Sequence, residues 1–98
     1  MKMTIGGHTY EVDRVEKTRY MDGTTALRLW DDLGELISTP TVNLAEYGLH
    51  PRLGQVFIKD YSEGEGVADE MERLGLVEKL ERFTFGPYNT PAWRVRVL

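Results

Sequence analysis

The amino-acid sequence predicts a single α+β domain over residues 1–98, in which a mostly antiparallel sheet packs against one amphipathic helix. Three observations support this prediction. Glycine-containing turns separate short alternating segments in the first half of the chain. An apolar segment then leads into an acidic stretch with helical spacing, and the chain ends on another alternating segment. A chain of 98 residues has room for one hydrophobic core.

The first half of the chain predicts an antiparallel meander without a helix. The expected turns are Gly6-Gly7, Asp22-Gly23 and Asp32-Leu33-Gly34. The expected strands are Met3–Ile5, His8–Val15, Thr25–Trp30 and Glu35–Leu44. Leu27 and Leu29 should face inward because they alternate with Arg28. Pro40 has no N–H to donate to a neighbouring strand, so the last segment is expected to be an edge strand or a broken one.

A strand is expected over Gln55–Tyr61, after a connecting loop over Ala45–Leu53. Apolar residues occupy both of its faces, with Val56 and Ile58 on one and Phe57 and Tyr61 on the other. Such a strand is usually central in a sheet or covered by a helix, and we expect one of these positions.

The helix is expected to begin at Ser62. Ser62 and Glu65 have the spacing of a capping box, in which a hydroxyl and a carboxylate each satisfy a free backbone N–H. One apolar stripe follows at i, i+4 and i+7, formed by Val67, Met71 and Leu74. Gly75 stands where a left-handed residue is expected to end the helix.

The C-terminal part predicts two more strands around a turn-rich loop. Leu76–Arg82 is a short mixed segment, and the loop runs from Phe85 to Pro91. The last segment alternates Trp93, Val95 and Val97 with Arg94 and Arg96. From these spacings the core is expected to contain Val56, Ile58, Val67, Met71, Leu74, Trp93, Val95 and Val97.

Composition excludes several classes of protein. The net charge of −4 argues against a protein that grips a nucleic-acid backbone, because such proteins present a basic surface. No apolar run is long enough for a membrane span, and the first residues do not form a signal peptide. The chain has no cysteine, which fits a reducing compartment, so a cytoplasmic location is expected.

Catalytic residue patterns are scarce. His8 and His50 are the only candidates for a general base near neutral pH, and neither has a nucleophile at a recognisable spacing. Their positions beside turns indicate surface histidines, and no cofactor or metal is expected. An enzyme that uses the carboxylates of Asp60, Glu63 and Glu65 is a lesser alternative, because such groups need burial to separate their pKa values.

The most uneven distribution of charge in the sequence is a run of acidic residues without an intervening basic one. This acidic run consists of Asp60, Glu63, Glu65, Asp69, Glu70 and Glu72. Arg73 is the one cation within helical reach, at i+4 from Asp69. The acidic run is therefore either a solvated helix face or a surface complementary to a basic partner.

The arginines and aromatic residues near the C-terminus are expected to stabilise the fold and not to bind a ligand. Arg82, Arg94 and Arg96 are too few for a nucleic-acid site, so we expect them to pair with acidic residues of neighbouring strands. The aromatic residues are expected to pack in the core or the loop, namely Phe85, Tyr88 and Trp93.

One stretch of the chain resembles a family of small uncharacterised proteins of phages and other mobile elements. In that family a V-N-L segment precedes a strand and turn similar to F-I-K-D-Y-S-E-N-E-G, followed by a helix. Val42-Asn43-Leu44 and Phe57–Gly66 match this pattern, with Gly64 in place of the usual Asn. The resemblance implies a genomic setting and no assigned activity. By analogy, small acidic proteins of such elements often bind host machinery, including defence complexes.

The leading hypothesis is a non-catalytic binding protein of a phage or mobile element that inhibits a host defence complex. Its partner would be a host protein with a basic surface, contacted through the acidic run, and neither nucleic acid nor a membrane is expected to bind directly. The alternative is a small structural or assembly protein that self-associates through sheet edges near Pro40 or Arg94.

Overall fold

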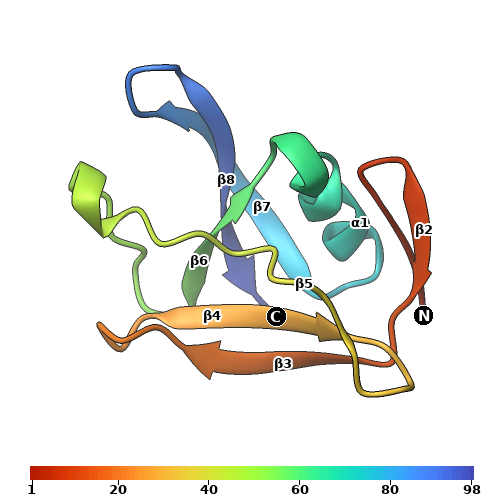
Figure 1. Ribbon diagram of the computed structural model, residues 1–98. Coiled ribbons are helices and arrows are strands. Elements are labelled where there is room, and N and C mark those ends of the chain that lie inside the picture. Colours follow the sequence, from red (N-terminus) through yellow and green to blue (C-terminus); the bar gives the residue numbers. More distant parts are fainter.

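The computed structural model describes residues 1–98 and contains three antiparallel sheets beside one short helix (Figure 1). The first sheet is the hairpin of β1 (Lys2–Ile5) and β2 (His8–Glu11). The second has the order β3 (Arg14–Arg19), β4 (Thr25–Trp30) and β5 (Leu36–Ser38). The third has the order β6 (Gln55–Lys59), β8 (Thr90–Val97) and β7 (Val77–Phe85). The helical elements are α1 (Val67–Arg73) and two 3-10 turns, η1 (Ala45–Tyr47) and η2 (Ser62–Gly64).

The three predicted turns of the N-terminal half are present, but the strands do not form a single meander. The expected strand His8–Val15 breaks at Val12 and Asp13, and its two parts join different sheets. The Val12 N–H donates to the Met1 carbonyl at 2.7 Å, whereas the Asp13 N–H donates to the Trp30 carbonyl at 2.8 Å. Because consecutive donors bond to different sheets, the chain turns at this point. Val12 itself is fully buried.

The segment around Pro40 was predicted to be an edge or a broken strand, and it is both. β5 lies at the edge of its sheet and ends at Ser38. Beyond it, the Thr41 hydroxyl accepts the Leu27 N–H of β4 at 3.2 Å. Thr41 also forms a bridge with Ile58 of β6, so it connects the second sheet to the third. Thr41 is buried, and its hydroxyl additionally bonds the Tyr20 hydroxyl at 2.9 Å.

The two apolar faces of β6 predicted a strand that is either central in its sheet or covered by a helix. It is covered by α1, and it is not central. The central strand of its sheet is β8, which pairs with β6 on one side and β7 on the other. The outer edge of β6 is occupied by the segment around Pro40: Lys59 N–H donates to the Pro40 carbonyl, and Val42 N–H donates to the Phe57 carbonyl. The two edges proposed for self-association, near Pro40 and Arg94, are therefore already paired.

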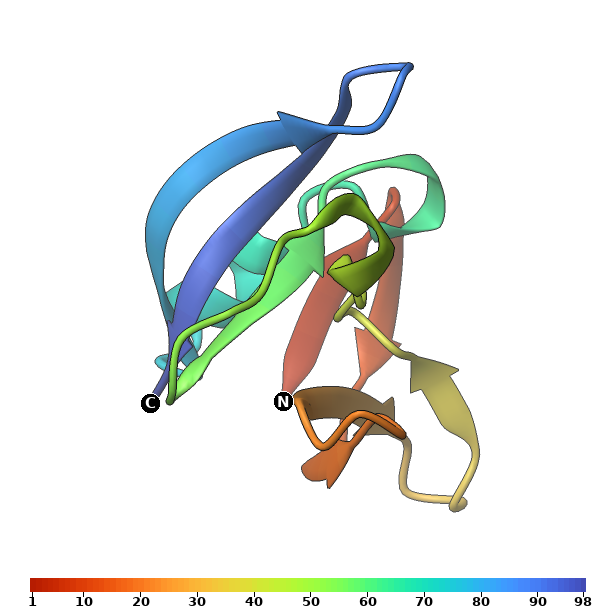
Figure 2. The same ribbon diagram turned by 90° about the vertical axis from the view of Figure 1, so that its left-hand side faces the viewer.

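One hydrophobic core joins the three sheets and α1. Figure 2 shows the two three-stranded sheets inclined to one another, with the β1–β2 hairpin beside them. The core cluster consists of Met3, Ile5, Val12, Leu27, Leu29, Val56, Ile58, Val67, Ala68, Met71, Val77 and Val95. Five of the predicted core residues belong to it, and the other three, Leu74, Trp93 and Val97, are partly buried against it. Each small sheet therefore depends on the others to bury its apolar face.

The predicted start of the helix is wrong, and its predicted end is confirmed. Ser62 lies in η2 at φ 53° and caps nothing; α1 begins at Val67, after Gly66 at φ 82°. The Gly66 N–H is held by the Asp60 carboxylate at 3.1 Å, so Asp60 fixes the approach to the helix. At the other end Gly75 is left-handed, and the N–H groups of Gly75 and Leu76 close the last turn. Neither α1 nor the 3-10 turns have the length and apolar character that crossing a membrane requires.

Met71→Ala tests the core assignment. The side chain of Met71 projects from α1 into the core and is fully buried, so its truncation should lower the free energy of unfolding by about 2–5 kcal/mol. Chemical denaturation of the two proteins measures this difference. Met21→Ala is the matched control because Met21 is fully exposed, and it should leave the midpoint unchanged. Equal midpoints for Met71→Ala and the wild type would contradict the packing of α1.

The pair Ser62→Ala and Asp60→Ala tests the start of the helix. Ser62→Ala should change the unfolding free energy by less than about 0.5 kcal/mol, because the hydroxyl caps no helix. Asp60→Ala should lower it by about 1 kcal/mol or more, because the Gly66 N–H loses its acceptor. Thermal or denaturant unfolding distinguishes the two. A larger loss for Ser62→Ala than for Asp60→Ala would restore the capping-box interpretation.

Candidate partner-binding surface

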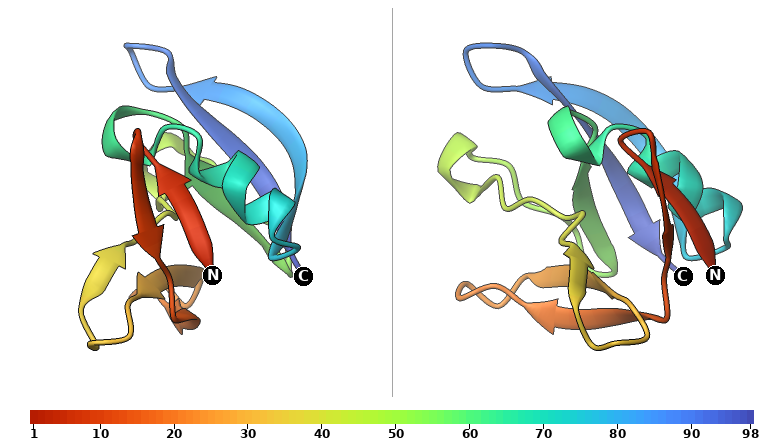
Figure 3. Two further views of the ribbon diagram at one scale, coloured as in Figure 1. Left: turned by 90° about the vertical axis from the view of Figure 1, so that its right-hand side faces the viewer. Right: turned by 45° about the vertical axis from the view of Figure 1, so that its right-hand side comes forward.

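The acidic run extends from the end of β6 to the last turn of α1, and its members have three different environments. Asp60 follows β6, Glu63 and Glu65 lie in and after η2, and the other three project from α1. Figure 3 shows α1 between the β1–β2 hairpin and the β7–β8 pair, so its side chains can reach strands on both sides.

Asp60 is a structural residue. Its side chain is only 17% exposed, and besides accepting the Gly66 N–H it lies 3.5 Å from the Arg82 guanidinium on β7. Both carboxylate oxygens are therefore engaged within the fold. Asp60 therefore links the approach to α1 with β7.

Glu70 joins α1 to the β1–β2 hairpin. Its carboxylate accepts the Thr4 N–H of β1 at 2.9 Å and binds the Arg73 guanidinium at 3.0 and 3.1 Å. Arg73 in turn donates to the Lys2 carbonyl at 3.1 Å. The hydrogen bond from Arg73, followed by that from the Thr4 N–H, lowers the pKa of Glu70 below its ordinary value. Arg73, the one cation within helical reach of Asp69, thus pairs with Glu70 instead.

Asp69 and Glu72 share a cation that lies outside the helix. The Lys79 ammonium of β7 pairs with Asp69 and lies 3.7 Å from Glu72, and both contacts help to raise the pKa of Lys79, with the Asp69 hydrogen bond as the largest cause. Glu72 also accepts the Lys79 N–H at 2.8 Å. The Lys79 ammonium lies over the ring of Trp93 at 4.8 Å. The acidic run is thus partly neutralised by contacts that sequence spacing did not reveal.

Glu70 and Glu72 therefore perform the same task on opposite sides of α1. Each carboxylate accepts a backbone N–H that an edge strand would otherwise leave free, at Thr4 of β1 and at Lys79 of β7. The helix closes two sheet edges with its acidic side chains, and this explains why like charges are tolerated on it.

Glu63 and Glu65 are different: both are exposed, and neither carboxylate forms an ion pair or a side-chain hydrogen bond in the structure. Their backbone, in contrast, is closely held. The Gly6 N–H of the β1–β2 turn donates to the Glu65 carbonyl at 3.2 Å. A Cβ at Gly6 would come within 2.9 Å of the Glu63 carbonyl oxygen, and one at Gly64 within 2.8 Å of the Lys59 side chain. The backbone is fixed by these contacts, while the two carboxylates remain free.

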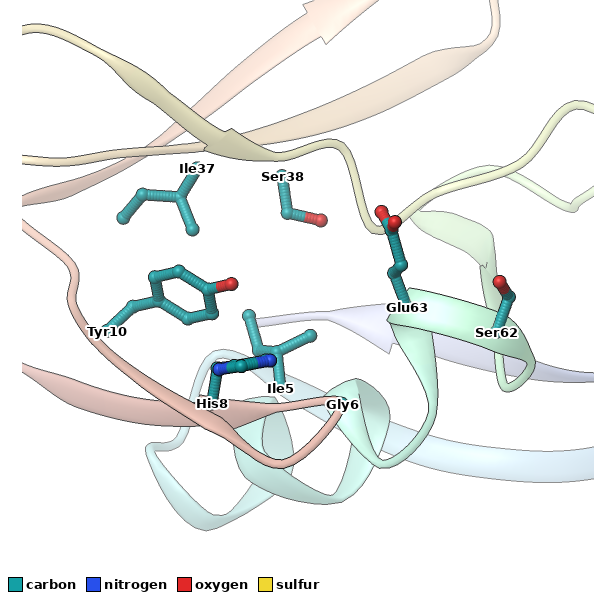
Figure 4. A pocket seen from close by; sticks show the side chains of 8 residues that line it. All are labelled: Ile5, Gly6, His8, Tyr10, Ile37, Ser38, Ser62 and Glu63. Carbon is teal, nitrogen blue, oxygen red and sulfur yellow. The ribbon is translucent and has the colours of Figure 1, made fainter.

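A cavity of about 390 Å³ opens beside Glu63, between the β1–β2 hairpin, β5 and η2 (Figure 4). Figure 4 shows Tyr10 and Ile37 facing one another, with His8 and Ile5 below them and Glu63 across the opening. The cavity therefore combines an apolar floor, an aromatic ring and one free carboxylate. Sequence reasoning did not find it, because its walls come from elements more than fifty residues apart.

Two of the three arginines near the C-terminus pair with acidic residues of the neighbouring strand, as predicted. Arg94 lies 3.4 Å from Glu81, and Arg96 pairs with Glu78. The third, Arg82 of β7, pairs instead with Asp60 after β6, a strand that β8 separates from β7. Of the three aromatic residues, Phe85 packs against Tyr47 and Tyr61, and Trp93 lies partly buried beneath Lys79. Tyr88 departs from the expectation of packing, because it is 89% exposed at the tip of the β7–β8 hairpin.

The two histidines lie at the surface, His8 at the start of β2 and His50 in the loop before β6. No three His, Asp or Glu side chains gather closely enough to hold a metal ion. Comparison with known proteins yields no protein-family model, no curated protein and no solved structure that matches this chain.

The lowered pKa of Glu70 makes stability depend on pH. A carboxylate whose pKa falls below 4.5 on folding contributes stability that is fully present above that pH and is lost as the pH falls through the folded-state pKa. Glu70→Gln should therefore flatten the decrease in unfolding free energy between neutral and acidic pH. Denaturant titrations at several pH values measure it. Glu65→Gln is the control, and a profile for Glu70→Gln that matched the wild type would contradict this role.

Proposed function

We propose that the protein is a non-catalytic protein-binding module of a phage or mobile element. In this proposal it inhibits a host defence complex by contacting a basic surface of that complex from a cytoplasmic location. The resemblance of Phe57–Gly66 to proteins of such elements motivates the genomic setting. The argument for binding depends on the geometry around η2.

The observation that carries the proposal is the contrast between a fixed backbone and free carboxylates at Glu63 and Glu65. A surface whose backbone is already ordered loses little conformational entropy when it binds. Two carboxylates without intramolecular partners provide charge complementarity to a lysine- or arginine-rich surface. Asp69 and Glu72 are also exposed, at 66% and 42%, but both pair with Lys79 on the β7 side of α1.

The cavity beside Glu63 suits the same type of partner. A lysine or arginine side chain has an apolar stem and a charged end. Its stem can pack against Ile5 and Tyr10 while its charge meets the Glu63 carboxylate. The proposed binding surface therefore consists of Glu63, Glu65 and this cavity. Asp60 and Glu70 support it from within the fold.

The test is charge reversal at Glu63 and Glu65, which avoids disturbing the contacts of Lys79. A partner is first captured from a bacterial host lysate, identified and purified. The double variant Glu63→Lys/Glu65→Lys should then weaken binding by on the order of 100-fold, because like charges face each other across the interface. Wild-type affinity should also decrease as salt is raised, since exposed charges are screened. Calorimetry or surface plasmon resonance measures both effects.

The matched control is Asp32→Lys/Glu46→Lys, which changes the net charge equally at two exposed positions outside this surface. It should retain wild-type affinity. Equal affinity of both double variants at low and high salt would contradict the proposed surface. Self-association, the alternative function, would appear instead as a molecular mass that rises with protein concentration.

A further inference from the structure

The arginines of this protein differ in whether their guanidinium groups have a partner within the fold. Of the eight in the chain, six pair with a carboxylate or lie over an aromatic ring, as Arg14 does over Trp30 at 5.0 Å. Arg19 and Arg52 alone have neither an ion pair, a side-chain hydrogen bond nor a ring contact. Both guanidinium groups are exposed and free to bind an anion.

These two arginines line the same cavity, although they are more than thirty residues apart in the chain. The cavity measures about 290 Å³ and lies between the β3–β4 turn and the segment that leads into β6. Its other walls include Gly54 and Gln55. The N–H groups of Leu53 and Gly54 donate no hydrogen bond within the protein. The Gln55 amide oxygen accepts from Arg94 at 3.1 Å, which leaves the amide NH₂ as a further donor.

We propose that this cavity binds a phosphate group. A guanidinium is planar and presents paired N–H donors that match phosphate oxygens, so it favours phosphate over a featureless anion. Free backbone N–H groups near a glycine add donors without adding acceptors. The two arginines supply the charge, and the chain before β6 supplies the neutral donors.

An opposing charge, Asp22, lies in the turn that contributes Gly23 and Thr24 to the cavity. Its oxygens are already engaged: one accepts from Thr24 N–H at 3.0 Å and from the Thr24 hydroxyl, and the other accepts from Asn43 at 2.9 Å. These bonds, the Thr24 hydroxyl first, lower the pKa of Asp22 to about 2, so it remains ionised. The balance around the cavity is two cations against one occupied carboxylate.

A second cavity restricts the class of ligand. Arg52 also lines a space of about 600 Å³ over the face of the third sheet opposite α1, with Phe57, Phe83 and Leu49 in its walls. This volume is typical of a small-molecule site. Because Arg52 lines both cavities, we infer a phosphate ester whose phosphate occupies the first cavity and whose planar body occupies the second. A nucleoside monophosphate is such a compound. A nucleic-acid polymer is disfavoured by the net charge of −4.

This site is independent of the proposed partner-binding surface. The β3–β4 turn and the start of β6 lie at the left of Figure 1, whereas α1 lies to the right of β6. Loss of one site should therefore leave the other intact, and the two proposals can fail separately.

The experiment is a titration of the whole protein by calorimetry with three probes: a purine nucleoside monophosphate, inorganic phosphate and the nucleoside alone. The monophosphate should bind most tightly and saturably. Arg19→Ala and Arg52→Ala should each weaken it at least about tenfold, because each removes charge-assisted hydrogen bonds. Lys17→Ala removes a neighbouring exposed cation from β3 and should have no effect.

Phe83→Ala separates the two cavities. It should weaken the monophosphate but not inorganic phosphate, whose unchanged binding also shows that the variant is folded. Equal affinity for monophosphate and inorganic phosphate would support the phosphate site and overturn the assignment of the second cavity. The absence of saturable binding by any phosphate probe, or equal losses for Lys17→Ala and Arg52→Ala, would overturn the proposal.

Discussion

The fold depends on one apolar core that three small sheets must share. A sheet of two or three strands cannot bury its apolar face alone, and none of the three sheets here is larger. Met3 of β1, Leu29 of β4 and Ile58 of β6 are all fully buried in the same cluster, together with Met71 of α1. The orientation of each sheet is therefore set by the others. Thr41 strengthens this arrangement because its hydroxyl bonds β4 while its backbone bridges β6.

The acidic side chains of α1 bond backbone N–H groups that the edges of these small sheets would otherwise leave free. Several short sheets expose several strand edges, and unpaired edges invite association with other chains. Glu70 and Glu72 close two of them by accepting the N–H groups of Thr4 and Lys79. Carboxylates that look like a free charged face in the sequence are thus part of the connection between helix and sheets. Only after these roles are assigned does the loop at Glu63 stand out as unpaired.

The protein presents two polar surfaces of opposite character on separate sides. The loop at Glu63 and Glu65 offers free carboxylates on a fixed backbone, and it supports the proposed contact with a basic protein. The cavity at Arg19 and Arg52 offers free guanidinium groups beside free backbone donors, and it supports the proposed phosphate site.

The sequence by itself determined the features whose causes are local. Glycine turns, period-two alternation in Thr25–Trp30 and β8, the apolar stripe of α1 and the left-handed Gly75 all follow from neighbouring residues, and all are present. Tertiary structure decided the rest. The predicted cap at Ser62 is absent because the Glu65 N–H bonds the Ser62 backbone carbonyl in η2. The helix begins only after Gly66, whose N–H bonds the Asp60 carboxylate that the fold brings to it. Three other features likewise depend on partners distant in sequence, which no local pattern can encode. They are the break at Val12, the pairing of Lys79 on β7 with Asp69 and Glu72 of α1, and the placement of Arg19 and Arg52 on one cavity.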